Sequence, residues 1–362
     1  MSDLLEAVDD EAALEELHSL ECTDGLPVVI PTTERVARMI LASGMDPDMV
    51  LGEMGPMLGI ATVEKVAVNA VMAGCTPDHM PLVIAAVKAT ADPRFDLMEM
   101  QATTHCTAPL IIVNGPARHD CGGLNSSFGA LGSGNRANAS IGRALRLCMI
   151  NIGGGRPGSS DMAVHGHPGK YTYCLAEAEE RSPFPPLHVS RGFEADDSVV
   201  TVIGCEAPHS VIYSVNADDP EDADKLLHVL SIGVANLATN HAIFNSGTAV
   251  VVLGPGHADV LANAGLSRED IAQQLWERTH MSVADLNRYG GQFGGRYEGQ
   301  DTYCALPSPE HFLILVAGGE GLYSMVMPSW GGGAHTNCPV SMKAEMDLFC
   351  EVPGLAAPRG VQ

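Results

Sequence analysis

The sequence predicts an α/β fold with an internally duplicated core and a helical pack at its N-terminal end. A helix-like segment leads to an apolar, β-branched run that ends in Gly-Pro at 109–116. The same order recurs in a helix-like segment at 225–239 and a run at 249–255, which also ends in Gly-Pro. A third apolar run, at 311–319, has a related character. This recurrence indicates the duplication of one α/β unit along the chain.

Three helices are expected before the first strand, because each apolar segment follows a threonine that can act as an N-cap. Glycine ends the first two helices, and proline stands at the first position of the third. The expected helices are 34–43 after Thr32 or Thr33, 63–73 after Thr62, and 78–91 after Thr76 and Pro77.

The two copies of the unit differ after Gly-Pro. In the second copy, Ser267 caps a helix over 268–279 soon after the strand. In the first copy, a glycine-rich stretch separates the strand from a helix expected to begin near Ala139 or Ser140. The first copy therefore has a longer loop at the carboxyl end of a strand, the edge at which α/β sheets bind ligands.

These patterns divide the chain into an acidic N-terminal segment (1–30), a first α/β half (31–200), a second α/β half (201–340) and a C-terminal tail (341–362). Eight of the first 21 residues are Asp or Glu, and none is Lys or Arg. This composition is typical of a solvated amphipathic helix or a tail.

The charge of the chain excludes some classes of binding partner. Its 362 residues include 44 Asp or Glu and 20 Lys or Arg, so the formal net charge is −24. Such a chain is repelled by nucleic acids and by anionic membranes. No apolar run is long enough to span a bilayer, and the N-terminus does not resemble a secretory signal. We therefore expect a cytoplasmic protein with reduced cysteines, since none of the ten forms a C-x-x-C pair, and we expect a homo-oligomer.

The basic residues are concentrated in the middle of this acidic chain. Eight of the 20 lie between residues 118 and 191, and Asp161 is the only acid in the interval 132–171. Glycine lets backbone N–H groups converge on an anion, and arginine binds carboxylate or phosphate with two hydrogen bonds. We therefore expect an anion pocket over 132–170, and the alternative is a surface loop whose arginines pair with nearby acids. The residues expected to bind the anion are Asn114, Asn135, Arg136, Asn138, Ser140, Arg143, Arg156 and His335.

Three side chains near the loop are candidates for catalysis. A neutral imidazole beside a cation is a candidate general base, because the cation depresses its pKa, and this applies to His105 and His165. Lys170 could stabilise developing negative charge. For either histidine, the alternative is a packed or exposed side chain without a chemical role.

A thiol and two carboxylates are further candidates. Cys75 directly precedes the Thr76 cap, so the following helix could stabilise a thiolate. The alternative is that Cys75 fills a corner between two helices. Glu177 and Glu180 could orient a histidine or form a solvated helix face.

A metal ion is not favoured, and the cofactor is unknown. Histidine and cysteine supply suitable ligand atoms, but no available pair has a recognised metal spacing. The pairs are His105-Cys106, His165-x-His167 and His335-x-x-Cys338.

Several long strings within residues 30–335 resemble a large bacterial family whose members occur with, or fused to, a small domain of the UGSC-motif (seleno)protein family. These strings are VAVNAVMAGC, QATTH, VNGP, GALGSGNRANASIGRALRL, NIGGGRPG, HGHPGKYTYC, AEAEERSPF and PLHVSRGF. The small domain is similar to the substrate-reducing selenoprotein of glycine reductase, so the resemblance implies redox or thiol-dependent bond cleavage.

The sequence also departs from this family pattern. It has no UGSC or CGSC string, so a UGSC-type partner would have to be a separate chain. Cys106 stands where the pattern has proline, which argues against Cys106 as a shared nucleophile. His167 stands where the pattern has glutamine, which favours His165 for any shared role.

Together, the residues and the resemblance predict an enzyme acting on a small carboxylate or phosphate. Arginines of the loop would hold the anion, a histidine would move a proton, and Cys75 would supply a thiol. The reaction would be that of a thiol-dependent oxidoreductase or lyase, or a hydrolysis. The alternative is a non-catalytic scaffold or substrate-delivery subunit for a small UGSC-type redox partner.

Overall fold

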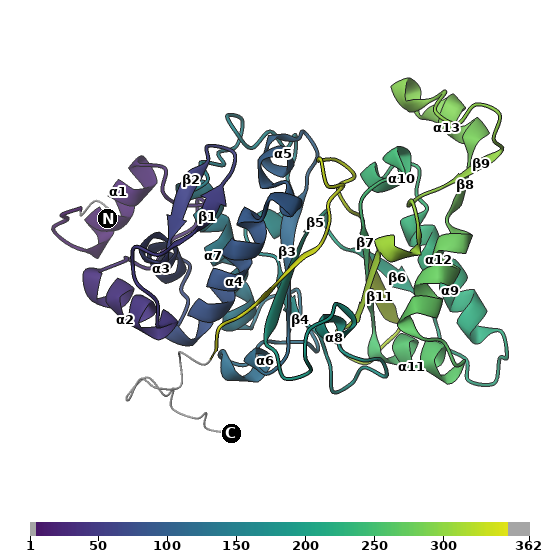
Figure 1. Ribbon diagram of the computed structural model, residues 1–362, viewed down its shortest axis with the longest axis horizontal. Coiled ribbons are helices and arrows are strands. Elements are labelled where there is room, and N and C mark those ends of the chain that lie inside the picture. The colour runs from purple at the N-terminus through teal and green to yellow at the C-terminus, as the bar shows by residue number, and fades with distance from the viewer. Residues whose placement is uncertain (1–4, 347–362) are drawn as a thin grey trace.

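Two mixed β-sheets pack face to face in the computed structural model, which describes residues 5–346 (Figure 1). Helices cover the outer face of each sheet, so the molecule has four layers in the order helices, sheet, sheet, helices. The expected α/β class is thereby confirmed.

Four strands form the first sheet: β3 (Ala108–Asn114), β4 (Cys174–Ala176), β5 (Val199–Cys205) and β12 (Val340–Lys343). Their order is β12-β5-β3-β4, in which β3 is parallel to β4 and antiparallel to β5, and β5 is antiparallel to β12. Leu110 and Ile112 face the second sheet, whereas Ile111 and Val113 face the outer helices. Both faces of β3 are therefore buried, which explains its continuous apolar sequence.

Four strands form the second sheet: β6 (His209–Ile212), β7 (Ala249–Leu253), β10 (Phe312–Val316) and β11 (Tyr323–Met327). Their order is β10-β7-β11-β6, in which β7 is parallel to β10 and antiparallel to β11, and β11 is antiparallel to β6. The topology of the first sheet is thus repeated, with β7 in the place of β3, as the predicted duplication requires.

The two sheets exchange their fourth strands. β6 follows β5 along the chain but pairs in the second sheet, and β12 follows β11 but pairs in the first. The two halves therefore interlock. β5 spans the predicted boundary at residue 200, and β12 spans the boundary at residue 340, so these divisions do not separate the two sheets. Residues 347–362 of the predicted tail lie outside the described residues.

The outer helices are arranged in two groups. The first sheet is covered by α2 (Thr33–Ser43), α3 (Val63–Met72), α4 (Met80–Ala91), α5 (Leu97–Ala102) and α7 (Arg136–Asn151). The second sheet is covered by α9 (Asp222–Val234), α11 (Pro255–Asn263) and α12 (Arg268–Arg278). The smaller elements are α1 (Asp10–Ser19), α6 (Ala117–Asp120), α8 (Leu187–Ser190), α10 (Asn240–Phe244), α13 (Val283–Tyr289), and the hairpins of β1 (Val50–Met54) with β2 (Gly59–Thr62) and of β8 (His280–Ser282) with β9 (Thr302–Cys304).

Most predicted helix starts agree with the structure. Thr32, Thr62 and Ser267 each accept a hydrogen bond from a backbone N–H in the first turn of the helix that follows. The prediction is wrong for α7, which begins at Arg136, because the Asn135 side chain accepts the N–H of Asn138 and caps the helix earlier. The predicted helix over 225–239 ends at Val234 and is followed by the separate short helix α10.

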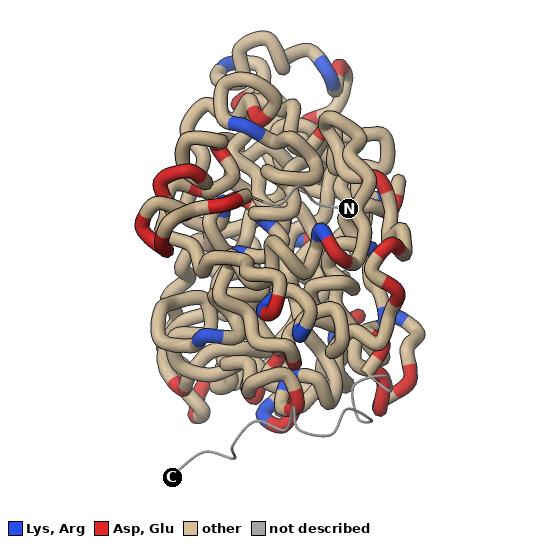
Figure 2. Tube along the Cα trace, turned by 90° about the vertical axis from the view of Figure 1, so that its left-hand side faces the viewer, with Lys and Arg blue, Asp and Glu red and all other residues tan. Residues whose placement is uncertain are grey.

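Acidic positions lie mostly along the periphery of the chain trace, and basic positions are scattered among them (Figure 2). Within residues 5–346, no helix combines the length and apolarity needed to cross a membrane. Part of the acidic N-terminal segment forms α1, which is capped by Asp9.

Candidate functional site

Polar side chains gather at both ends of the strands of the first sheet. We call the end where β3 and β4 begin and β5 ends the upper edge, and the opposite end the lower edge, following Figure 1. α5 precedes β3 at the upper edge, and α6 follows β3 at the lower edge.

A cavity of about 600 Å³, which we call the Lys170 cavity, opens at the upper edge. The Nζ atom of Lys170 lies 2.7 Å from both carboxylate oxygens of Asp161. Arg146 approaches the same carboxylate, with its Nη1 atom 3.6 Å from Oδ2. The side chains of Arg146 and Asp161 are buried, so one carboxylate is held between two cations in the wall of the cavity. The charged and imidazole side chains of the inner wall are Arg146, Arg156, Asp161, His165, His167 and Lys170.

Burial changes the pKa of Lys170 in this wall. It lowers the pKa of Lys170, because desolvation outweighs the hydrogen bond to Asp161, and the charge of Arg146 acts in the same direction. Lys170 therefore gives up its proton more readily than an exposed lysine.

The two histidines of the cavity differ in whether their ring nitrogens are hydrogen-bonded. His167 has both ring nitrogens engaged, since Nε2 donates to the Cys205 carbonyl at 3.2 Å and Nδ1 accepts the Gly169 N–H at 3.1 Å. Burial lowers the pKa of His167, which keeps this ring neutral. His165 is exposed to the cavity, and its ring makes no hydrogen bond to the described part of the chain. His165 is therefore the imidazole of this cavity whose ring is free to contact a ligand.

The N-terminal segment forms the outer rim of the Lys170 cavity. Arg156 donates to the carbonyl of Glu21 and lies 3.4 Å from its carboxylate. Glu21 is largely exposed, so this ion pair is weak and can be replaced by another anion. Arg156 is the predicted anion-binding arginine that faces this cavity.

A second group, the His105 cluster, lies at the same edge and consists of His105, Cys106 and Glu206. The imidazole Nε2 of His105 is 2.7 Å from Oε1 of Glu206. One ligand atom from each of the three residues lies within 4.8 Å of the other two. Glu206 also lines a separate cavity of about 720 Å³ beside β6 and α9.

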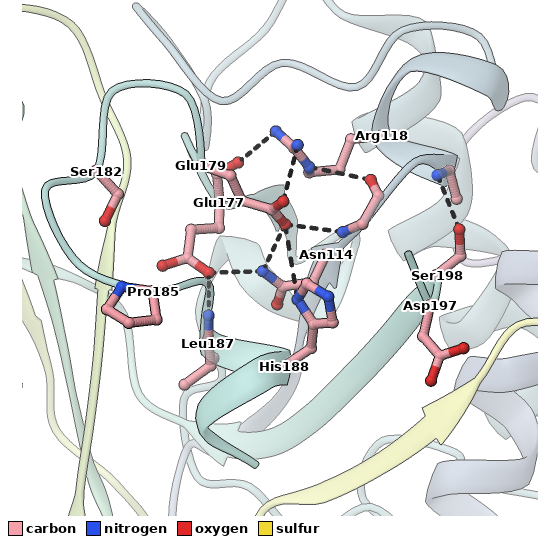
Figure 3. Close-up of polar contacts among 12 residues, drawn as sticks. Asn114, Arg118, Glu177, Glu179, Ser182, Pro185, Leu187, His188, Asp197 and Ser198 are labelled. Atoms are coloured by element: carbon pink, nitrogen blue, oxygen red, sulfur yellow. Dashed lines mark hydrogen bonds and ion pairs between the residues drawn. The ribbon is translucent and has the colours of Figure 1, made fainter. Parts of the chain in front are cut away.

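The predicted residues Asn114 and Glu177 lie together at the lower edge, in a group we call the Glu177 cluster (Figure 3). Glu180 belongs to the same group, because it is bonded to Arg118, which also donates to the Glu177 carbonyl. Glu177 is fully buried and accepts hydrogen bonds from Asn114, from the backbone of Leu187 and from Arg268 of the second half. Burial raises the pKa of Glu177, although Arg268 opposes the shift. The cluster also contains Arg118, Glu179 and His188.

The Glu177 cluster joins the halves rather than lining an opening. Arg118 binds Glu180 through two hydrogen bonds and also binds Glu179. None of the three cavities described in this section reaches Glu177, Glu180 or Asn114. Their expected roles in catalysis and anion binding therefore receive no support from the structure.

Arg136 and Arg143 do not meet in an anion pocket, contrary to expectation. Arg136 donates two hydrogen bonds to the carbonyl of Gly74 at the lower end of α7, and Arg143 is paired with Asp24 at 2.7 Å. The 16 residues of α7 span about 24 Å, so its lower end cannot share a site with Arg156 beyond its upper end. These arginines fasten neighbouring segments to the helix.

The asparagines and serine of the same stretch also serve the fold. Asn135 caps α7, and Asn138 binds backbone groups of Asn125 and Ala130 and so holds the loop before the helix. Ser140 is buried within α7. The glycine-rich loop at the lower edge is therefore a connector, and the Lys170 cavity lies at the opposite edge. Arg136 lines a smaller cavity of about 250 Å³ together with Arg35 and Arg38.

Cys75 and His335 stand apart from the Lys170 cavity. Burial raises the pKa of the Cys75 thiol, so the expected thiolate is not favoured, and Cys75 fills a corner after α3 beside the same cavity of about 250 Å³. His335 is paired with Asp96 through Nδ1 at 2.8 Å. The nine described cysteines are free, and Cys350 lies outside the described residues.

Sequence reasoning missed Arg146, Asp161 and Glu206. Asp161 could have been identified from the sequence, because it is the only acid in the interval 132–171 and the basic residues around it are available to form ion pairs with it. Glu206 had none, because it lies 101 residues from His105 and meets it only through the pairing of β3 with β5.

Neither protein-family models nor curated proteins give a match to this chain. The resemblance to the UGSC-associated family stays a prediction.

Proposed function

We propose that the chain is an enzyme that binds a small carboxylate or phosphate in the Lys170 cavity and moves a proton on it. The observation that carries this proposal is the buried Arg146–Asp161–Lys170 group in the wall of a cavity that also holds a free histidine. A cavity of about 600 Å³ is of the size that takes small ligands.

The charges of the wall favour an anion. Arg146, Arg156 and Lys170 supply three cations, and Glu21, Asp24 and Asp161 supply three carboxylates. The carboxylate of Asp24 is already paired with Arg143, which is not among the lining residues. Arginine can bind a carboxylate or phosphate with two parallel hydrogen bonds, and Arg156 can exchange its exposed partner Glu21 for a ligand. With Arg143 counted, the cations exceed the carboxylates by one, against a net charge of −24 for the whole chain.

The proton would be moved by His165, whose ring is free, and Lys170 would stabilise the negative charge that develops on the substrate. Such a pair suits lyase or hydrolytic chemistry. The thiol-dependent reaction through Cys75 is not part of this proposal, because that thiol is buried beside a different cavity.

Ligand binding can be tested by thermal shift with inorganic phosphate, pyrophosphate, malonate and citrate. The best compound should bind Arg156→Gln at least about tenfold more weakly, because a hydrogen bond to a charged group contributes roughly 1.5–3 kcal/mol. Arg181→Gln is the matched control, since it removes an equally mobile cation that pairs with Glu320 away from the cavity. Equal losses in the two variants would mean that net charge, and not the cavity, governs binding.

Catalysis can be tested by following the bound compounds by NMR in D₂O. We expect deuterium incorporation or product formation with the unaltered chain, and its loss in His165→Gln with binding retained. A His165→Gln variant that keeps full turnover would contradict the assigned role.

A further inference from the structure

The His105 cluster combines three chemically different ligand atoms at one point of the upper edge. An imidazole nitrogen of His105, the sulfur of Cys106 and a carboxylate oxygen of Glu206 lie within 4.8 Å of one another. All three residues are half-buried, so their side chains are held in place but remain reachable from solvent.

The chain fixes this arrangement from two strands. The pairing of Ala108 in β3 with Cys205 in β5 brings the residues just before β3 beside the residue just after β5. The Glu206 backbone is held by its N–H, which donates to the Pro328 carbonyl at 2.8 Å, and by its own carbonyl, which accepts the Tyr173 hydroxyl at 2.8 Å. The cluster is therefore built on the rigid end of the sheet.

One ring nitrogen of His105 is unaccounted for. Nε2 is bonded to Glu206, whereas Nδ1 is buried and finds no hydrogen-bond partner in the part of the chain that the structure describes. A buried polar atom without a partner is costly in a folded protein. A ligand coordinated through Nδ1 would supply the missing partner and leave the hydrogen bond between Nε2 and Glu206 in place.

The charges around the cluster also allow a cation. The Glu206 carboxylate lies 2.7 Å from the imidazole of His105, and no lysine or arginine in residues 5–346 is paired with it. Lys170, the lysine of the neighbouring cavity, is itself paired with Asp161 at 2.7 Å. The negative charge of Glu206 is therefore left to attract a positive ligand.

We propose that His105, Cys106 and Glu206 bind one divalent transition-metal ion of the zinc class. Nitrogen, sulfur and oxygen ligands together suit Zn²⁺ and Co²⁺, whereas Mg²⁺ and Ca²⁺ take oxygen ligands alone. Three protein ligands leave a fourth position open, as in zinc sites that bind water or substrate. Binding through the Nδ1 lone pair displaces no proton from the His105 ring, and the thiol proton of Cys106 is released to solvent.

This site does not depend on the proposed function. The Lys170 cavity can bind an anion without the ion, and the His105 cluster can bind the ion without the anion. The two ideas therefore fail separately.

Cobalt substitution tests the site by a readout other than activity. The full chain is stripped with a chelator and titrated with Co²⁺ alone. We expect a thiolate-to-cobalt charge-transfer band in the near ultraviolet that saturates at one ion per chain. Cys106→Ser should abolish the band, and Glu206→Gln should weaken Co²⁺ binding at least about tenfold, the lower end of the losses caused even by residues outside the ligand set.

Cys304→Ser is the matched control, because Cys304 also lies beside a histidine, with its sulfur 3.6 Å from Nδ1 of His280. That pair belongs to no group of three metal-ligating side chains in residues 5–346. The band should therefore be unchanged in Cys304→Ser. Its absence from the unaltered chain, its persistence in Cys106→Ser or its loss in Cys304→Ser would overturn the proposal. If Cys106→Ser does not fold, an unchanged Co²⁺ affinity in folded Glu206→Gln would overturn it.

Discussion

The two edges of the first sheet carry similar residue types and use them differently. At the lower edge, Glu177 is fully buried and its hydrogen bonds come from Asn114, Leu187 and Arg268, so the charges hold the two halves together. At the upper edge, Asp161 is also buried, but its partners Arg146 and Lys170 line an opening. Buried carboxylates and their cations connect the two halves of the protein where they bond only to one another. Where they line a cavity, they are candidates for a binding site.

Removing a charge from the lower edge should have the largest effect on stability. Arg268→Met leaves Glu177 buried without its cation, and breaking a buried ion pair costs about 3–5 kcal/mol. We expect a loss of this size in the free energy of unfolding, measured by urea denaturation. Glu206→Gln at the upper edge should cost clearly less, because Glu206 is half-buried. Equal losses would remove the distinction between the edges.

Removing the carboxylate of the upper edge should weaken the fold moderately. Asp161→Asn leaves Arg146 and Lys170 facing one another, with an expected loss of about 1–3 kcal/mol in the free energy of unfolding. Inorganic phosphate should raise the melting temperature of this variant more than that of the unaltered chain, because the anion takes the place of the carboxylate. A phosphate response no larger than that of the unaltered chain would argue that the cavity does not select anions.

Glu180 lies on the exposed side of the Glu177 cluster, and substituting it should change stability only at acidic pH. Hydrogen bonds from Arg118 lower the pKa of Glu180 to about 2. A carboxylate with a depressed pKa stabilises the folded state above its unfolded pKa, near 4.5, and loses that contribution as the pH falls toward 2. Glu180→Gln should therefore lose less stability than the unaltered chain between these pH values, by a small amount because Glu180 is largely exposed. Parallel pH profiles in thermal denaturation would contradict this.

Cysteine labelling probes the two edges without changing the protein. Cys106 at the upper edge is half-buried, whereas Cys75 is 8% exposed and burial strongly raises the pKa of its thiol. Iodoacetamide at neutral pH should therefore modify Cys106 faster than Cys75, as measured by peptide mass spectrometry. Faster labelling of Cys75 would restore it as the reactive thiol. Prior addition of Zn²⁺ should slow the labelling of Cys106 only.

Local features of the fold could be predicted because they depend on adjacent residues. The threonine caps of α2 and α3 and the apolar runs of β3 and β7 are visible in the sequence itself. The same kind of reasoning failed at α7, because Asn135 caps the helix before the expected start. Local chemistry therefore predicts elements better than their first residue.

The candidate site was predicted in part. Arg156, His165 and Lys170 lie on one glycine-rich segment and do line one cavity. Arg136 and Arg143 could not be separated from them by sequence, because their actual partners, Gly74 and Asp24, lie 62 and 119 residues away. Which cations face a cavity is decided by such distant pairings.

The exchange of fourth strands decides the order in which the two sheets can be completed during synthesis of the chain. Thr201 of β5 is bonded to Ser341 of β12, 140 residues later. At a synthesis rate of about 5–20 residues per second, roughly 7–28 s pass between these two residues. During that time the side of β5 that later pairs with β12 has no strand beside it, and such an unpaired apolar strand readily pairs with strands of other chains. The first sheet, although it begins earlier in the chain, is therefore closed only after the second sheet has received all of its strands.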